Sequence, residues 1–445
     1  MKKTWKTIII FLATLSVTVI AGCIVLLIIY QIRKNENDTA VLSDTAYNSV
    51  IQDVENDPAP SYAGAYTGDD ISETATAAPV DASPDLEAAD DIPDEQMQKL
   101  AEDTLEWEEG PSDIETEAQP EGSQKSPVTM VFTGDICFHD PFANMGAYRQ
   151  RGSSIDNCID ETLLSQMRSA DICMVNNEFP YSDRGTPLEG KTYTFRSRPE
   201  NVHILTDMGV DIAGIANNHA FDHGQEAFLD TLDILDNEGI AHVGGGKNLE
   251  EASSPVLMEV NGIKTGFVAA TQIERTGSPD TRGATNELPG VMRCFSDGEL
   301  ERFLEEIRLA DRECDFLVVF VHWGSENTDV LDFRQTDQAE AFAQAGADLI
   351  VGCHPHCLQG LGQVGSVPVI YSLGNYWFNS KTVDTALLKV VIDGEGIQSL
   401  QMIAARQHDC RTDHMEGSEA QRIYDYLNSI SRDGVSLDSD GYMIR

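Results

Sequence analysis

The sequence predicts an α/β domain over residues 127–431, and three observations lead to that class. Short apolar runs, such as VTMVFT at 128–133 and FLVVFV at 316–321, have the composition of buried strands. They alternate with amphipathic segments that have the length and end signals of helices, which is the pattern of an α/β domain. An Asn-Gly pair at 261–262 between two apolar runs indicates a β-hairpin. The sheet pairing is therefore expected to be mixed.

The elements follow one another in a regular order. Strands are predicted at residues 128–133, 172–175, 210–215, 256–260, 265–270, 316–321, 349–351, 367–373, 386–392 and 398–404. Helices are predicted at residues 161–170, 225–237, 297–311 and 339–345. The helix at 225–237 has an apolar face and ends before Gly239, a residue that commonly terminates helices. The last two strands form a hairpin that closes the domain, and residues 432–445 follow as a C-terminal tail.

The N-terminal region predicts a membrane anchor within residues 1–34. The apolar run at 8–30 contains no charged residue and can span a bilayer, which needs about 20 helical residues. A cleaved signal peptide is the alternative, but its apolar region is only roughly 7–15 residues long. Three lysines precede the run and two basic residues follow it, a bias that places the N-terminus in the cytoplasm. We therefore expect a single-pass protein of the cell membrane with an extracellular C-terminal domain.

Residues 35–126 are predicted to be a disordered acidic linker. Acidic residues far outnumber the one basic residue of residues 35–124, Lys99. Low hydrophobicity combined with high net charge cannot offset the entropy lost on ordering. Within the linker, residues 93–107 have a loose helical spacing of apolar side chains. They form either a short helix that docks on the domain or a transient helix.

Net charge and cysteine content narrow the range of possible partners and of possible disulfide bridges. The formal net charge of the chain is −44 at pH 7, and no basic patch is visible, so nucleic acid is not an expected partner. Nine cysteines are present, without a CxxC pair or a zinc-ribbon spacing. We expect mostly free, buried thiols, with a local bridge between Cys353 and Cys357 as the alternative.

Side chains that can bind metals follow several predicted strands. They are Asp135 in FTGDICFHD, Glu178 in VNNEFP, Asn218 and His219 in GIANNHAFDHG, His322 in FVHWGSE, and His354 and His356 in VGCHPHCLQG. Each motif has a structural explanation when taken alone: a turn, a helix cap or a histidine packed at a strand end. Ligands of open α/β sheets bind beyond the carboxyl ends of the strands, where these motifs would converge. Together the motifs predict a metal site.

The donor types define the chemistry of this site. Mixed carboxylate, amide and imidazole ligands suit one or two divalent ions, Mn, Fe or Zn. Such an ion supplies hydroxide near neutral pH. His219, which is not an obvious ligand, is the candidate to protonate a leaving oxygen. Asp222 and His223 in the same loop are expected to support the ligands from behind.

Seven short motifs resemble, in order and spacing, those of the bacterial capsule-synthesis protein CapA family. They are GDI at 134–136, NNE at 176–178, KTYTF at 191–195, ANNHAFDHG at 216–224, HWGSE at 322–326, GCHPH at 352–356 and YSLGNYWF at 371–378. The resemblance covers residues 128–391. The family is named for the membrane-linked synthesis or export of capsular poly-γ-glutamate, and its fold is similar to that of calcineurin-like metallophosphatases.

The resemblance implies a metallophosphatase-like four-layer α/β sandwich behind the transmembrane helix and acidic linker. It also implies roles for the strand-end residues: metal ligands at Asp135, Glu178, Asn218, His322, His354 and His356, and a catalytic histidine at His219. Two positions depart from the pattern. Cys353 replaces the first histidine of the family's usual Gly-His-His-Pro-His, and Cys137 follows Asp135 where metallophosphatases begin with Asp-x-His. The number of bound ions, one or two, therefore stays open.

Two functions remain in competition. The first is a metal-dependent, phosphoesterase-like hydrolase of capsule biosynthesis or export, with an anionic polymer or a phosphoester as substrate. The second is a non-catalytic subunit of a capsule polymer synthase complex that binds metal or polymer. In both cases the expected partners are the membrane and the synthase subunits. A plain adhesive ectodomain would have no use for the group of ligands.

Overall fold

The computed structural model describes residues 126–274 and 282–444. All described residues belong to one compact unit. The predicted anchor and nearly all of the predicted linker lie outside the described residues. Among residues 126–274 and 282–444, no helix is long and apolar enough to cross a membrane.

The first sheet has eight strands in the order β16-β15-β14-β1-β2-β3-β4, with β13 pairing with β1 beside this path. The strands are β1 (Val128–Ile136), β2 (Ile172–Asn177), β3 (Ile212–Gly214), β4 (Ala241–Val243), β13 (Asn375–Trp377), β14 (Val383–Asp393), β15 (Gly396–His408) and β16 (Arg411–His414). The pairs from β1 to β4 are parallel, and those from β1 through β14 to β16 are antiparallel.

The second sheet has six strands in the order β11-β12-β10-β9-β7-β6. They are β6 (Val256–Val260), β7 (Ile263–Thr271), β9 (Phe316–His322), β10 (Leu349–Cys353), β11 (Leu361–Val364) and β12 (Val367–Ile370). Its centre is parallel, and the hairpins β6–β7 and β11–β12 are antiparallel. Two small sheets pair β5 (Gly245–Gly246) with β8 (Gly290–Val291), and β17 (Ser436–Leu437) with β18 (Met443–Ile444).

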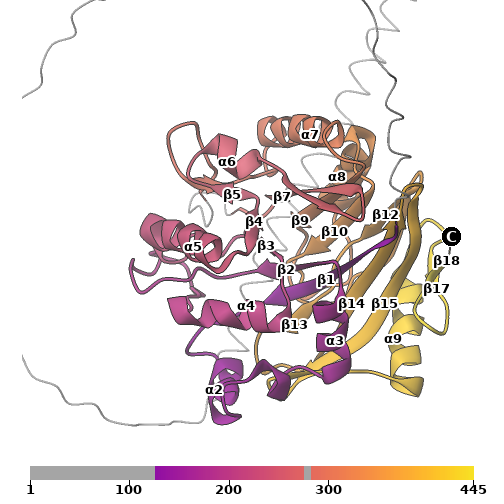
Figure 1. Ribbon diagram of the computed structural model, residues 1–445, viewed down its shortest axis with the longest axis horizontal. Helices are drawn as coiled ribbons and strands as arrows, with labels where there is room; N and C mark the ends of the chain where they lie inside the picture. Colours follow the sequence, from indigo (N-terminus) through magenta and orange to yellow (C-terminus); the bar gives the residue numbers. More distant parts are fainter. Residues whose placement is uncertain (1–125, 275–281, 445) are drawn as a thin grey trace, which may run out of the picture. The chain divides into compact units, whose positions relative to one another are not determined.

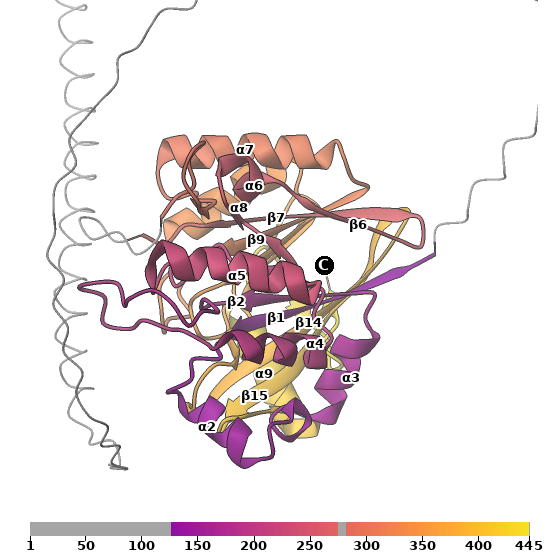
Figure 2. The same cartoon turned by 60° about the vertical axis from the view of Figure 1, so that its left-hand side comes forward.

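Helices cover the outer faces of the two sheets (Figures 1 and 2). The helices are α2 (Ala143–Gln150), α3 (Glu161–Ser169), α4 (His203–Met208), α5 (Gly224–Glu238), α6 (Leu249–Ser253), α7 (Asp297–Asp311), α8 (Phe333–Ala345) and α9 (Gly417–Ile430), with short 3₁₀ turns at Ile155–Asn157 and Pro199–Val202. Figure 2 shows α7 and α8 over the second sheet, and α3 and α4 on the far side of the first. The layers follow in the order helix, sheet, sheet, helix.

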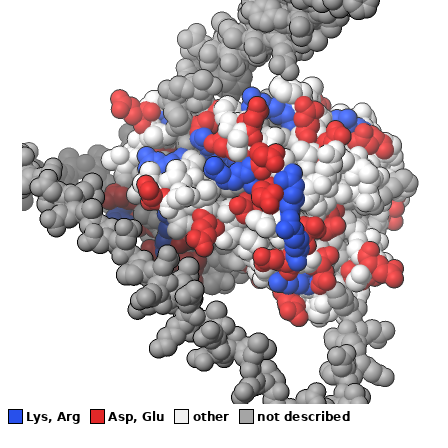
Figure 3. Space-filling model, turned by 90° about the horizontal axis from the view of Figure 1, so that it is seen from above, with Lys and Arg blue, Asp and Glu red and all other residues white. Residues whose placement is uncertain are grey.

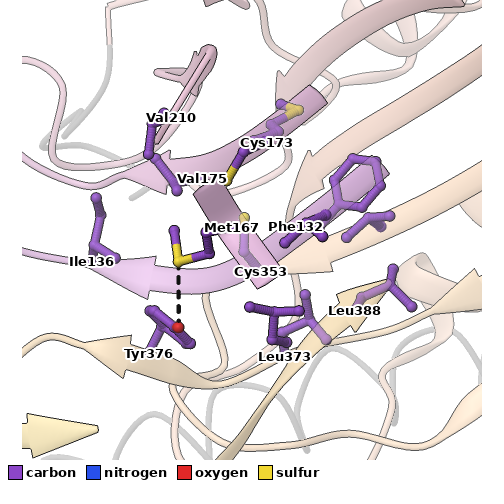
Figure 4. Close-up of a cluster of buried hydrophobic side chains, with 14 of the residues drawn as sticks. Phe132, Ile136, Met167, Cys173, Val175, Val210, Cys353, Leu373, Tyr376 and Leu388 are labelled. Carbon is purple, nitrogen blue, oxygen red and sulfur yellow. Dashed lines mark hydrogen bonds between the residues drawn. The ribbon is translucent and has the colours of Figure 1, made fainter. Parts of the chain in front are cut away.

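Two hydrophobic clusters hold these layers together. The larger fills the space between the sheets, where the rings of Phe132 and Phe267 lie 6.5 Å apart, and continues beneath α3 and α4. Figure 4 shows part of it, including the Tyr376 hydroxyl, which donates a hydrogen bond to the sulfur of Met167. The smaller cluster packs α7 and α8 on the second sheet through Phe303 and Phe342. The mixed α/β fold predicted from the sequence is confirmed.

The boundaries of several elements differ from those predicted. The strand expected at 367–373 ends at Ile370, and the helix expected at 339–345 begins at Phe333. The early start of α8 follows from a capping box. The Asp332 side chain accepts a hydrogen bond from the Gln335 N–H, and the Gln335 side chain accepts one from the Asp332 N–H. Helices α2, α4, α6 and α9 and strands β4, β5, β8, β11, β13, β16, β17 and β18 were not predicted.

The segment after α9, predicted to be a C-terminal tail at residues 432–445, contacts the domain. Val435 and Leu437 are buried in the larger cluster, and the Met402 N–H donates to the Gly441 carbonyl at 2.8 Å. The eight cysteines from Cys137 to Cys410 are all free and mostly buried, as predicted, and no bridge joins Cys353 to Cys357.

Surface charges of both signs lie interspersed on the face seen from above in Figure 3. Lys and Arg side chains there adjoin Asp and Glu side chains and form no continuous basic surface. Among the described residues, Arg308 on α7 pairs with Glu305 at 3.0 Å. Exposed pairs of this kind contribute little to stability, about 0.2–1 kcal/mol each.

Candidate metal centre

The carboxyl ends of the parallel strands of both sheets bring the predicted residues together. In the first sheet, Asp135 on β1 pairs in register with Asn176 on β2, and Glu178 follows directly. In the second sheet, His322 at the end of β9 lies opposite Cys353 at the end of β10. Asn218 comes just after β3 in the chain. The six predicted ligands therefore come from both sheets and meet at one edge.

A glycine allows β1 to reach this edge. A Cβ on Gly134 would lie 1.8 Å from the carbonyl oxygen of Gly374, so no other residue fits there without a shift of the backbone. The Asp135 N–H donates to the same carbonyl at 2.9 Å. Close packing thus requires the glycine near the end of β1, and the hydrogen bond of the next residue holds the backbone of Asp135 in place.

One of two fully buried groups of possible ligands consists of Glu178, His322 and His354. Each offers one ligand atom, and these atoms lie within 4.8 Å of one another. The Nε2 atom of His322 is 3.9 Å from Glu178 Oε1 and 2.8 Å from Asn218 Oδ1, so the amide of Asn218 faces the same point. All four residues are buried. We call this group the inner position.

A second group, called here the middle position, consists of Asp135, Glu178 and His356. His356 Nδ1 lies 3.1 Å from Asp135 Oδ2 and 2.9 Å from Asn375 Oδ1, and its Nε2 lies 3.8 Å from Glu178 Oε1. The side-chain amide of Asn176 donates to both carboxylates, at 2.7 Å to Asp135 and 3.2 Å to Glu178. Because Glu178 belongs to both positions, it can bridge two ions.

The residues present fit a divalent cation. Glu178 Oε1 and His354 Nδ1 are buried without a hydrogen-bond partner among the described residues. Buried polar atoms nearly always have a partner, so two orphaned atoms in one group of possible ligands indicate a missing partner. Carboxylate, amide and imidazole donors together are the ligand types of Mn, Fe and Zn. The predicted metal-binding groups are therefore present, and nothing in them identifies the metal.

Burial and charge set the protonation of the histidines. Burial lowers the pKa of His322 and His354 well below the usual value, so both rings are neutral, the form that binds metals. Burial, with the Asp135 charge adding to it, raises the pKa of Glu178. Burial also acts to lower the pKa of His356, but the carboxylates of Glu178 and Asp135 outweigh it and raise that pKa to about 10. A bound cation would take the place of this proton.

His219 stands beside the ligands and is held by Asp222. Its Nδ1 lies 2.7 Å from Asp222 Oδ2, and its Nε2 lies 3.8 Å from Glu178 Oε1. The ring stacks on Phe195 with centroids 4.1 Å apart. Burial lowers the pKa of His219 to about 4. The ring is therefore oriented with one nitrogen toward the metal group and the other toward a carboxylate.

Lys191 is a buried member of the site that sequence reasoning did not assign. Its Nζ donates to Asp222 Oδ1 at 2.7 Å and to the Asn218 carbonyl at 2.5 Å, and its side chain is only 6% exposed. Breaking a buried ion pair by removing one partner costs about 3–5 kcal/mol. The sequence signal was the position of Lys191 in the KTYTF motif, which gave no hint that it reaches Asp222.

The remaining predicted and overlooked residues have distinct places. His223, expected to support the ligands, is the N-cap residue of α5 and is not one of the possible metal ligands among the described residues. Cys353 Sγ lies 3.3 Å from His322 Nδ1, so it contacts the ring nitrogen that faces away from Asn218. Cys137 is fully buried in the larger hydrophobic cluster. Glu326, also overlooked, lies with His354 and His356.

The fold and this arrangement of ligands define an α/β protein with a candidate metal centre between two sheets, and comparison with known proteins gives its family. Residues 129–380 match the family described as bacterial capsule synthesis protein PGA_cap, which is more than half of the chain and contains every predicted site residue. The chain belongs to this family. The resemblance found in the sequence motifs is confirmed.

Curated relatives agree with this assignment. The PGA biosynthesis protein CapA of Bacillus subtilis is 30% identical over 247 residues, 54% of this chain and 63% of the relative. The capsule biosynthesis protein CapA of Bacillus anthracis is 30% identical over 216 residues, 48% of this chain and 52% of the relative. A probable polyglutamine synthesis accessory protein of Mycobacterium tuberculosis is 28% identical over 278 residues, 59% of this chain and 73% of that protein. The chain thus spans little more than half the length of the two Bacillus relatives.

A solved structure aligns only loosely. The crystal structure of a hypothetical protein from Thermus thermophilus is 16% identical and covers 63% of this chain and 99% of its own, with a TM-score of 0.38. A score this low supports no conclusion about function.

Proposed function

We propose that this chain acts in the synthesis or export of a poly-γ-glutamate capsule as a metal-dependent hydrolase of the phosphoesterase type. One observation carries the proposal. Glu178 Oε1, which is buried and has no hydrogen-bond partner among the described residues, lies within 3.8–3.9 Å of the Nε2 atoms of His219, His322 and His356. A carboxylate oxygen facing three imidazole nitrogens has little structural purpose without a cation between them.

The ligands divide between the two positions. Glu178, Asn218, His322 and His354 would hold an ion at the inner position, and Asp135, Glu178 and His356 would hold one at the middle position. An ion bound there, of the Mn, Fe or Zn class, lowers the pKa of bound water and polarises a phosphoryl oxygen. The neutral rings of His322 and His354 need lose no proton to bind it.

The chain's own contribution to proton transfer is His219. Asp222 accepts from its Nδ1–H and keeps Nε2 directed at the ligand group, while Lys191 and the Phe195 N–H hold Asp222 in place. Burial keeps the ring neutral in the free chain. An anionic substrate brings negative charge close to the ring and favours its protonated form, which can then deliver a proton to the leaving oxygen.

A second function has one observation in its favour. Metallophosphatases have a histidine two residues after their first aspartate, and this chain has Cys137, which is fully buried in the hydrophobic core. Among the residues that the structure describes, the middle position therefore has only Asp135, Glu178 and His356 as possible ligands. A centre that holds an ion weakly suits a non-catalytic subunit of a capsule polymer synthase, which would bind metal or polymer for export.

The proposal places the domain outside the cell on an N-terminal anchor. The support is the uncharged apolar run at residues 8–30, together with the capsule-related names of the relatives. The membrane and synthase subunits would then be the partners. The chain's charge of −44 would repel an anionic polymer unless a bound cation intervened, so the metal centre is the proposed contact point for such a substrate.

Changing His219 separates the two functions. In the full chain loaded with Mn²⁺, His219→Ala should lower hydrolysis of a generic phosphodiester by about 10²–10⁴-fold, because general acid catalysis contributes that much. The content of bound Mn²⁺ should not change. The control is His203→Ala, an exposed histidine on α4. If the wild-type chain binds Mn²⁺ and shows no hydrolysis, the hydrolase is excluded and the binding subunit remains.

A further inference from the structure

The loop that follows β9 is fastened to the turn that follows β10. The Trp323 N–H donates to the Cys353 carbonyl at 3.1 Å, and the Asn327 N–H donates to the Pro355 carbonyl at 2.8 Å. The Gln359 side-chain amide adds a third bond, to the Thr328 carbonyl at 3.0 Å. These bonds join residues before and after Glu326 to residues before, within and after the turn that carries His354 and His356. The distance between Glu326 and the histidines is therefore fixed by the backbone.

The local sequence makes this loop possible. Gly324 has φ +84°, and a Cβ there would lie 2.7 Å from the side chain of Gln335. Asn327 has φ 57°, a left-handed conformation that asparagine tolerates better than most residues. With these two residues the chain turns back toward the metal centre directly after His322. The carboxylate of Glu326 is thereby brought to the mouth of the centre.

Glu326 then forms a third group of possible ligands, with His354 and His356, in which the ligand atoms lie within 4.8 Å of one another. His354 Nδ1 is buried and has no hydrogen-bond partner among the described residues, which is consistent with a cation bound to this group. Glu326 and His356 are partly exposed, whereas Asp135 and Glu178 are fully buried. This group therefore lies on the solvent side of the inner and middle positions.

We propose that Glu326 is a metal ligand and that, with His354 and His356, it forms an outer metal position at the mouth of the centre. The proposal rests on the proposed function, since it requires that the centre binds a divalent ion. An ion that arrives from solvent meets Glu326 and His356 first. The outer position shares His354 with the inner position and His356 with the middle one. An ion bound at the outer position can therefore pass from it to either of the buried positions.

The test is Mn²⁺ binding to the metal-free full chain, monitored by isothermal titration and by the EPR signal of unbound Mn²⁺. The variant is Glu326→Gln, which keeps the size of the side chain and removes its charge. The matched control is Glu313→Gln, an exposed glutamate of the same domain. Loss of a group that only supports a ligand weakens metal binding about 10–100-fold, so loss of a ligand should weaken it at least as much.

We expect Glu326→Gln to weaken the weakest Mn²⁺ binding step of the wild-type chain by at least about 10-fold, and to leave the tightest step unchanged. Glu313→Gln should leave every step unchanged. The inference is overturned if the wild-type chain binds Mn²⁺ and Glu326→Gln binds it with the same constants at every step. A wild-type chain that binds no Mn²⁺ overturns the proposed function as well, so the two failures are distinguishable.

Discussion

Two of the proposed ligands, both histidines, have a backbone conformation that most residues other than glycine avoid. His354 has φ 99° and His356 has φ 57°, both in the region that favours glycine. Each non-glycine residue held in such a conformation costs of order 1–3 kcal/mol, and such residues cluster at functional sites. The turn thus directs two imidazoles toward the groups of possible ligands, and its strained backbone lowers the stability of the fold.

Replacing His354 with two different small residues tests this strain. His354→Gly and His354→Ala both remove the imidazole and leave nearly the same space. Glycine usually destabilises a protein relative to alanine, but at a φ of 99° the order should reverse, with the glycine variant more stable by about 1 kcal/mol. The measurement is urea unfolding of the metal-free chains. An alanine variant equal to or more stable than the glycine variant would show that the turn is not strained.

At the scale of residues, the sequence supports part of the site and not the rest. Asp135, Glu178 and the histidines were predictable because each follows an apolar strand and has the chemistry of a ligand. Lys191 and Asn176 were not predictable, because their roles depend on contacts with Asp222 and Asp135, which lie 31 and 41 residues away in the chain. A lysine or an asparagine is common in loops, and its residue type alone does not indicate a distant partner.

Helix α8 shows how a local signal sets the length of an element. The predicted helix was short because apolar periodicity is visible only from Ala339. The structure starts the helix at Phe333, where Asp332 accepts from the Gln335 N–H at 3.0 Å. The side chain of Gln335 also donates to Gln359, on the loop that carries the metal-binding turn. The first turn of α8 is therefore hydrogen-bonded to the loop that follows the candidate metal-binding turn.

Asp332→Ala should destabilise the chain by about 1 kcal/mol, the usual cost of losing an N-cap. The reason is that the Gln335 N–H loses its acceptor at the first turn of α8. Thermal unfolding of the metal-free chain measures the effect. Asp337→Ala, an exposed change in the same helix, is the control and should have little effect. Equal stability of the two variants would mean that the capping box contributes nothing to α8.

Other elements differ in how well the sequence could reveal them. Buried strands such as β1 and β9 were predicted because a short run of β-branched and aromatic residues is typical of a strand inside a core. Helix α9 places Ala420, Ile423, Tyr424 and Leu427 on one face, a periodicity that the sequence contains and that could have predicted it. Strand β13 has three residues, too few for any periodicity, and only its parallel pairing with β1 identifies it.

At the scale of the whole domain, the candidate metal centre depends on two sheets that meet at their carboxyl ends. The first sheet supplies Asp135 and Glu178, and the second supplies His322 and the turn after β10. Each of the inner and middle positions combines a carboxylate from the first sheet with an imidazole from the second. A cation bound between them would hold the layers together, so it should stabilise the fold as well as form the site.

The central claim, that a metal ion binds between the two sheets, is tested most directly by anomalous diffraction from crystals of the domain grown with Mn²⁺ or Zn²⁺. We predict an anomalous peak within about 2.0–2.4 Å of Glu178 Oε1, in contact with His322 or His356, because these are ordinary distances between such ions and their oxygen ligands. Peaks at surface histidines such as His408, with no peak beside Glu178, would contradict the account.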